Sequence, residues 1–177
     1  MAIIKPNNNT ISAITAVPAG VGGKVLQVVE DIQNLGNALS SGSHGTWLDG
    51  GLSYVSITPI STSSKILIGY YGIRGHTNSG ATNTGSFYSI HRSVNAGAIV
   101  NLGNATYGMQ ETAAGTADNR AVPLDLVHLD EPNTTSECRY YAYFKAYGGS
   151  GQYYFHHVGY AGSAAMPIVK IAMEIAG

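Results

Sequence analysis

Histidine is the residue type in this 177-residue chain with the widest chemistry, because imidazole both binds metals and transfers protons. His156 and His157 are adjacent, so on a β-strand their side chains face opposite sides and cannot bind one metal together. Three others, His76, His91 and His128, have no carboxylate at a spacing typical of metal ligands. A metal held by one histidine from each subunit of an assembly is the alternative, with His156 or His157 as the ligand. Within one chain the sequence predicts no metal site.

The remaining reactive side chains are also isolated from one another. Asp125 and the Asp130–Glu131 pair offer carboxylates, but nothing ties two of them to one cleft as in a glycosidase, so we expect solvated turn residues. Cys138 is the single cysteine, and we expect a small buried residue and not a catalytic thiol or a disulfide. Residues 20–24 lack the phosphate-loop spacing, with Val25 where serine or threonine should stand. The sequence therefore predicts a protein that is not an enzyme and carries no cofactor.

The composition is typical of an all-β protein that buries much of its surface. Charged residues make up 11% of the chain, against about 25% in an ordinary soluble domain, whereas glycine (23) and tyrosine (12) are abundant. The net charge of −1, with lysine and arginine scattered singly, argues against a nucleic-acid partner. We expect no membrane insertion and no signal peptide, because no apolar run approaches the roughly 18 residues of a spanning helix. Low charge also suits a surface buried in an assembly, where charge is costly.

The elements that would position these side chains are short strands. In residues 51–68, Val55 and Ile57 alternate with polar residues, Pro59 ends the first strand, and Lys65 begins the second. A strand is expected at 24–32, where a helical stripe is the alternative. Further strands are expected at 87–94, 98–102, 121–129, 138–147, 152–160 and near the C-terminus. Short strands without a convincing long helix predict an all-β fold, a single β-sandwich (jelly-roll-like) domain.

Two of these strands have distinct faces. The apolar face of 138–147 consists of Cys138, Tyr140, Ala142, Phe144 and Ala146. The opposite face consists of Arg139, Tyr141, Tyr143, Lys145 and Tyr147. Because tyrosine and arginine are enriched at interface cores, this second face fits a subunit contact; a solvated face with locally packed tyrosines is the alternative. In the last strand we expect Lys170 and Glu174 to face solvent, and the following side chains to face inward: Val169, Ile171, Met173 and Ile175.

Residues 1–23 differ from the rest of the chain. Apolar residues stand among alanine, serine, threonine and asparagine and are followed by Pro18 and a glycine-rich stretch, so the segment has no core of its own. A merely solvated tail would lack its larger apolar side chains, Ile3, Ile4, Ile11, Ile14 and Val17. We therefore expect an extended N-terminal docking arm at 1–23 that lies on a partner, followed by a β-sandwich domain at 24–177. The alternative is a strand exchanged with a neighbouring subunit.

Two long polar segments are candidates for recognition. Residues 75–85 separate two expected strands without an aromatic side chain, and they include His76, Thr77, Asn78 and Asn83. Residues 107–120 form a second long polar stretch, which begins with Tyr107. Loops on a rigid sandwich commonly hold binding residues, so one interpretation is a receptor or glycan site on either segment. A plain surface loop is the other interpretation.

Three segments of the chain resemble one protein family. The sequences GKVLQVV at 23–29, GLSYVSITPISTSSKILI at 51–68 and KIAMEIAG at 170–177 are similar to those of virion appendage proteins of tailed bacteriophages, described as tail-fibre-like, head-fibre or capsid-decoration proteins. The resemblance spans roughly residues 22–177. It implies a β-sandwich that forms homotrimers and has a non-enzymatic structural role on the virion surface. It also implies synthesis in the host cytoplasm, which needs no leader.

Two placements on the particle follow from this resemblance. A tail fibre needs a long shaft between its anchor and its tip, whereas only residues 1–23 precede the expected domain. This shortness favours a knob on the capsid, as decoration or a short head fibre, over a tail fibre or receptor-binding tip. Expected partners are further copies of the chain, phage capsid or tail proteins, and a host surface glycan or receptor. A free glycan-binding lectin is a further alternative, because jelly rolls host lectins and tyrosine-rich faces stack on sugars.

Overall fold

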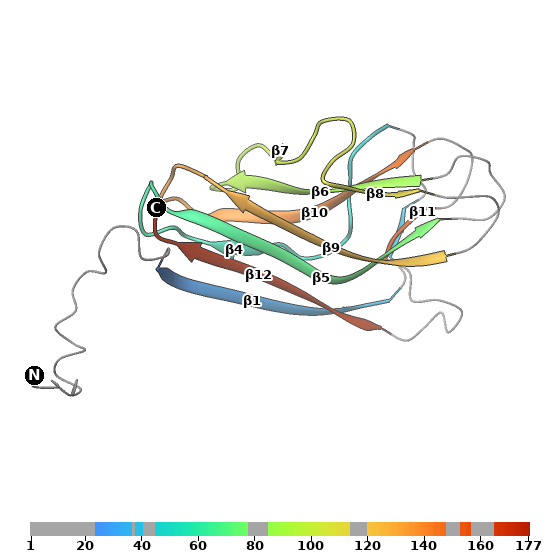
Figure 1. Ribbon diagram of the computed structural model, residues 1–177, viewed down its shortest axis with the longest axis horizontal. Helices are drawn as coiled ribbons and strands as arrows, with labels where there is room; N and C mark the ends of the chain where they lie inside the picture. The colour runs from blue at the N-terminus through green and yellow to red at the C-terminus, as the bar shows by residue number, and fades with distance from the viewer. Residues whose placement is uncertain are drawn as a thin grey trace, which may run out of the picture.

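The structure, a computed structural model, describes residues 24–36, 38–40, 45–77, 85–113, 120–147, 153–156 and 165–177. Every regular element in these ranges is a β-strand, and the strands form two sheets that pack face to face (Figure 1). The predicted all-β fold and β-sandwich are therefore confirmed. Among the same residues, no helix is long and apolar enough to cross a membrane. The arm at 1–23 lies outside the described ranges, so the arm and its boundary with the domain stay predictions.

The first sheet, which we call the β5 sheet, is antiparallel and contains β1 (Val25–Leu35), β2 (Ala38–Ser40), β5 (Lys65–Thr77), β9 (Arg120–Asp130), β11 (Tyr153–His156) and β12 (Met166–Ile175). β9 pairs with one edge of β5, and β12 and β11 pair with different stretches of the other edge. β1 follows β12, and β2 follows β11. The strand predicted at 24–32 is thus present as β1.

The second sheet, which we call the β10 sheet, is also antiparallel and contains β3 (Leu48–Asp49), β4 (Val55–Ile57), β6 (Gly85–Val94), β7 (Val100–Asn101), β8 (Gln110–Ala113) and β10 (Cys138–Tyr147). β10 pairs with β6 along its whole length and with β3 and β4 on its other edge. β7 and β8 pair with β6. The two strands predicted within 51–68 are β4 and the start of β5, and they belong to different sheets.

The core lies between the two sheets and is filled by alternate side chains from each strand. From β10 it takes the face that the alternation predicted, Cys138, Tyr140, Ala142, Phe144 and Ala146. From β5 and β9 it takes Ile66, Ile68, Tyr70, Leu124 and Leu126. Burial raises the pKa of the Cys138 thiol, which keeps it protonated and unreactive.

The orientation of β12 is the reverse of the predicted one. Lys170 and Glu174 are fully buried and share the inward face with Ile168 and Ala172. The side chains expected to face inward lie half-buried on the outer face of the sheet: Val169, Ile171, Met173 and Ile175. The predicted alternation is present, but the prediction of which face is buried was wrong. The reason is that both charged groups find polar partners inside the sandwich.

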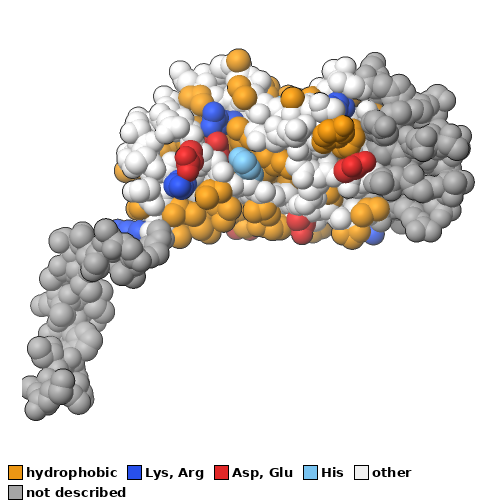
Figure 2. Space-filling model, turned by 45° about the horizontal axis from the view of Figure 1, so that its top comes forward, with side chains coloured by type: hydrophobic (Ala, Val, Ile, Leu, Met, Phe, Trp, Pro, Cys, Tyr) orange, Lys and Arg blue, Asp and Glu red, His pale blue; other side chains and the backbone are white. Residues whose placement is uncertain are grey.

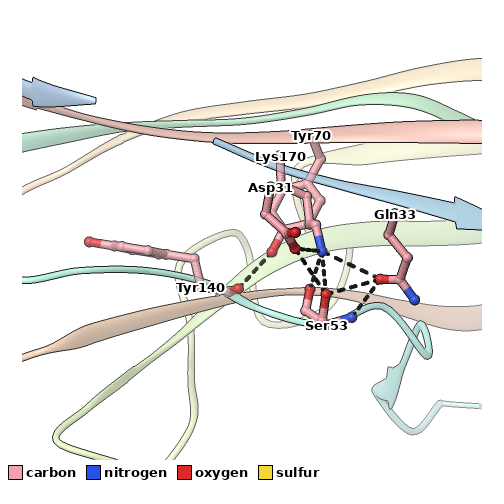
Figure 3. A network of polar contacts seen from close by, with 6 residues as sticks. All are labelled: Asp31, Gln33, Ser53, Tyr70, Tyr140 and Lys170. Atoms are coloured by element: carbon pink, nitrogen blue, oxygen red, sulfur yellow. Dashed lines mark hydrogen bonds and ion pairs between the residues drawn. The ribbon is translucent and has the colours of Figure 1, made fainter. Parts of the chain in front are cut away.

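Polar groups from two other segments surround the Lys170 ammonium (Figure 3). Its Nζ contacts the Asp31 carboxylate and the Ser53 hydroxyl, and it donates to the Ser53 carbonyl at 3.1 Å and to Gln33 Oε1 at 3.4 Å. The Ser53 N–H also donates to Gln33 Oε1 at 2.9 Å, so the segment before β4 is joined to β1. The hydrogen bond from Lys170 lowers the pKa of Asp31, which favours the charged pair.

Glu174 is buried on the same face with partners of its own. Gln27 Nε2 donates to one of its carboxylate oxygens at 2.6 Å, and the Ile60 N–H donates to the other at 2.7 Å. Burial alone would raise the pKa of Glu174, but hydrogen bonds, among them these two, outweigh it and lower that pKa. The carboxylate therefore stays charged inside the fold because donors replace the water it loses.

Asp130 is a third buried charge, although the sequence predicted a solvated turn residue. It lies at the end of β9, with Arg92 Nη1 at 2.7 Å from its carboxylate. The Tyr140 hydroxyl donates to the same carboxylate at 2.8 Å. The prediction was wrong because both partners come from the β10 sheet, which sequence spacing does not reveal. Its neighbour Glu131 is exposed and pairs with Lys65, and Asp125 is exposed on β9.

Asp31→Asn should destabilise the fold by about 3 kcal/mol, because it leaves the fully buried Lys170 ammonium without a countercharge. Glu30→Gln is the matched control, since it removes the neighbouring, exposed carboxylate of β1 and should change the free energy of unfolding by less than about 0.5 kcal/mol. Urea denaturation of the three proteins measures both differences. Equal losses in the two variants would contradict the burial of Lys170.

Candidate functional site

The predicted subunit contact lies on the outer face of β10 and comprises Arg139, Tyr141, Tyr143, Lys145 and Tyr147. Side chains of the same chain cover part of this face. Lys145 is only 6% exposed, and its Nζ lies 4.8 Å from the ring centroid of Trp47 and 5.5 Å from that of Phe87. Burial lowers the pKa of Lys145. The side chain of Tyr147 lies outside the described part of the structure.

The other residues of this face also pack against rings of the same chain. Tyr143 stacks on His91, with ring centroids 4.1 Å apart and an interplanar angle of 4°. Tyr141 contacts Tyr54, with ring centroids 5.4 Å apart, and the Arg139 guanidinium lies 4.9 Å from the Tyr54 centroid. These side chains therefore form an aromatic cluster within one chain. A contact between subunits on this face stays a prediction.

His91 is a buried titratable group at the aromatic cluster, and the Trp47 ring also contacts it edge-on. Burial lowers the pKa of His91 to about 4, so its imidazole is neutral at neutral pH. Neutral imidazole can bind metals, but the described residues contain no group of three or more histidine, cysteine, aspartate or glutamate side chains that could hold one. His156 is buried, and its Nδ1 accepts the Arg74 N–H at 3.1 Å. His157 lies outside the described residues.

The Ser53 hydroxyl and the Lys170 amine are in contact, an arrangement that some hydrolases use for nucleophilic attack. That chemistry needs a neutral amine that accepts the serine proton. Here the Asp31 carboxylate forms an ion pair with the same Nζ, and the Ser53 hydroxyl donates to Asp31 at 3.0 Å. The three groups therefore form a structural ion-pair network, without a free base for the serine.

The predicted recognition segment and arm fall mostly outside the described residues. The backbone of His76 and Thr77 ends β5 and pairs with β9, while their side chains are outside the described part. Asn78 and Asn83 lie outside it altogether, as do all the arm residues, Ile3, Ile4, Ile11, Ile14 and Val17. Recognition at 75–85 and docking by the arm stay predictions.

An apolar surface, which the sequence analysis did not predict, covers the outer face of the β5 sheet; we call it the apolar face. Its exposed side chains are Val28, Ile32, Tyr71, Val127 and Leu129. Between them lie half-buried side chains, Leu67, Val169, Ile171 and Met173. Figure 2 shows hydrophobic side chains gathered along the lower border of the described part of the molecule.

The pairing of four strands makes the apolar face continuous. Directly opposite residues of antiparallel strands point to the same side, so each row crosses β1, β12, β5 and β9 in turn. One row is Val28, Met173, Leu67 and Leu129. The next is Glu30, Ile171, Gly69 and Val127. The Tyr71 ring lies over Gly69, since a Cβ added to that glycine would be 2.5 Å from Tyr71 Cε2. The ring thus fills the position where the row lacks a side chain.

The sequence contains a signal for this surface. Three consecutive residues of β5, Ile66–Ile68, are apolar, and Leu126–Val127 in β9 breaks the alternation in the same way. Strands with both faces covered read as nearly continuous apolar runs. These runs indicate that the outer face of the β5 sheet, like its inner face, carries apolar side chains.

Comparison with known proteins gives no family for this chain. No protein-family model matches the sequence, and no curated protein matches it. One similar solved structure is described as "Structure of infectious bursal disease virus Gx strain", with 14% sequence identity and a TM-score of 0.30. The match covers 86% of this chain and 37% of that viral chain, so the chain spans well under half of its length. At this TM-score the likeness supports no conclusion about function.

The buried His91 should make stability depend on pH between about 4 and 6.5. The unfolded chain binds the histidine proton below pH 6.5, whereas the folded chain binds it only near pH 4, so the free energy of unfolding falls as the pH is lowered through this window. One proton contributes at most about 1.4 kcal/mol per pH unit. His91→Phe keeps a ring against Tyr143 and should remove this slope. Urea denaturation between about pH 4 and pH 6.5 measures the free energy of unfolding of the wild type and of His91→Phe. If this free energy depends on pH in the same way in both proteins, His91 is not held neutral.

Proposed function

We propose that this chain is a non-enzymatic structural protein of a tailed-bacteriophage virion, a homotrimeric β-sandwich knob docked on the particle by its N-terminal arm. Its place is the capsid surface, as a decoration protein or short head fibre. The observation that supports this proposal is the apolar face, together with the resemblance of the three sequence segments to phage appendage proteins.

The apolar face supports an assembly role because soluble monomers rarely expose contiguous apolar patches larger than a few hundred Å². The β5 sheet buries Lys170 and Glu174 on its inner side and exposes Val28, Val127 and Leu129 on its outer side. A monomer in water would be more stable with the charged side chains on the outer side and the apolar side chains on the inner side. The Ser53–Lys170 contact belongs to the ion-pair network with Asp31 that joins β1, β12 and the segment before β4.

The aromatic cluster supports a second candidate function, glycan binding. Tyr54 and Tyr107 are 40% and 59% exposed, and both belong to contacts on the outer side of the β10 sheet. Exposed aromatic rings stack on the apolar faces of sugars, so a lectin-like domain or a receptor-binding tip of a tail fibre would use this side. A glycan array with the full chain separates this candidate from the first, because a decoration protein needs no sugar.

Deleting residues 1–20 should leave a folded protein that no longer joins virions. Each of the arm's isoleucines, once buried on a particle, would contribute roughly 1.5–3 kcal/mol to docking. The measurement is mass spectrometry of virions assembled with either the full or the shortened chain, with circular dichroism as the control for folding. A high copy number per virion supports the capsid, and a low one supports the tail fibre. Normal incorporation of the shortened chain would show that the arm is not the anchor.

A further inference from the structure

We propose that a second copy of this chain covers the apolar face, so that the outer side of β1, β12, β5 and β9 is the subunit interface of the assembled protein. This inference rests on the proposed function, because it names the partner in the assembly. It places the interface on the sheet opposite to the tyrosine-rich face of β10.

The size of the apolar face matches one side of a protein interface. Four strands of about ten residues cover roughly 34 Å by 19 Å, or about 650 Å², at ~3.4 Å per residue and ~4.8 Å between strands. A standard interface buries about 800 Å² on each partner. The face is thus too large for a small ligand and supplies most of what a stable contact between two copies needs.

The charges of the apolar face lie at its border. Glu30 is on β1, at one edge, and Asp125 is on β9, at the other, where it accepts the Gly72 N–H at 3.1 Å. Lys65 and Glu131 form an ion pair of 2.7 Å at the end of the strands. An apolar centre with a polar rim is the ordinary anatomy of a protein interface.

The position of the charges at the border favours a second copy of the chain as the partner that covers the apolar face. The interior of the face offers no cluster of one charge that would select a basic or an acidic partner. Copies of this face can meet around the axis of the homotrimer without burying an unpaired charge, because Glu30 and Asp125 stay at the rim. Tyr71, lying over Gly69, closes the gap between the rows, so the surface can pack against another sheet as the two sheets of the sandwich do.

The test compares two valines with nearly equal exposure on opposite sheets. Val127 is 51% exposed on the apolar face, and Val100 is 52% exposed on β7 of the β10 sheet. Val127→Glu should weaken self-association at least tenfold in sedimentation velocity at micromolar concentration, and Val100→Glu should leave it unchanged. Val28→Glu, on the edge strand β1, should repeat the effect of Val127→Glu. Circular dichroism identifies any variant that has lost its fold.

Four results would overturn the interface. The first three are a wild-type monomer, an oligomer that survives both Val127→Glu and Val28→Glu, and an oligomer that Tyr141→Ala with Tyr143→Ala dissociates while Val127→Glu does not. Dissociation on removal of residues 1–20 alone would also overturn it, since the arm would then hold the copies together. Virion incorporation is scored separately. An oligomer insensitive to Val127→Glu that still joins virions refutes the interface and leaves the proposed function standing, whereas an oligomer that never joins virions refutes only the function.

Discussion

The buried Lys170 ammonium is the constraint on which the arrangement of the β5 sheet depends. An ammonium between two sheets is costly unless a countercharge and hydrogen-bond acceptors surround it, and Asp31 and Ser53 supply them. Because side chains alternate along a strand, burying Lys170 turns its neighbours on β12 outward. Glu174, with partners of its own, holds the same register. The apolar side chains of β12 therefore face outward because the polar contacts of Lys170 and Glu174 occupy the inner side of the strand.

The buried charges act on register more than on stability. A buried ion pair adds little net stability over apolar residues of the same volume, but leaving one partner unpaired is expensive. A slip of β12 by one residue would expose Lys170 and Glu174, and it would leave Asp31 and Gln27 without their hydrogen-bond partners. At the end of β9, Asp130 bonds to the β10 sheet and links the two layers. We infer that these contacts select one pairing of strands among several that apolar residues alone would accept.

The part of the fold that follows from local pattern was predictable from the sequence, and the part that depends on distant partners was not. Alternation over 138–147 correctly placed Cys138 and its apolar neighbours in the core. The same rule misassigned β12, because Ser53 lies 117 residues before Lys170 and Gln27 lies 147 residues before Glu174. Of the candidate site, the sequence located the residues around Tyr143 but not their packing on His91. The apolar face was missed because charged residues were assumed to mark the solvent side.

The first and last strands described in this chain, β1 and β12, are neighbours in one sheet (Figure 1). During synthesis β1 leaves the ribosome before β12, which is its partner in the sheet and follows all the other described strands. The apolar face, whose rows need both strands, is thus the last surface of the domain to be completed. A chain that stops before Met166 cannot present it. A fragment that lacks β12 would therefore also lack the interface proposed above, because β12 supplies the second strand of every row.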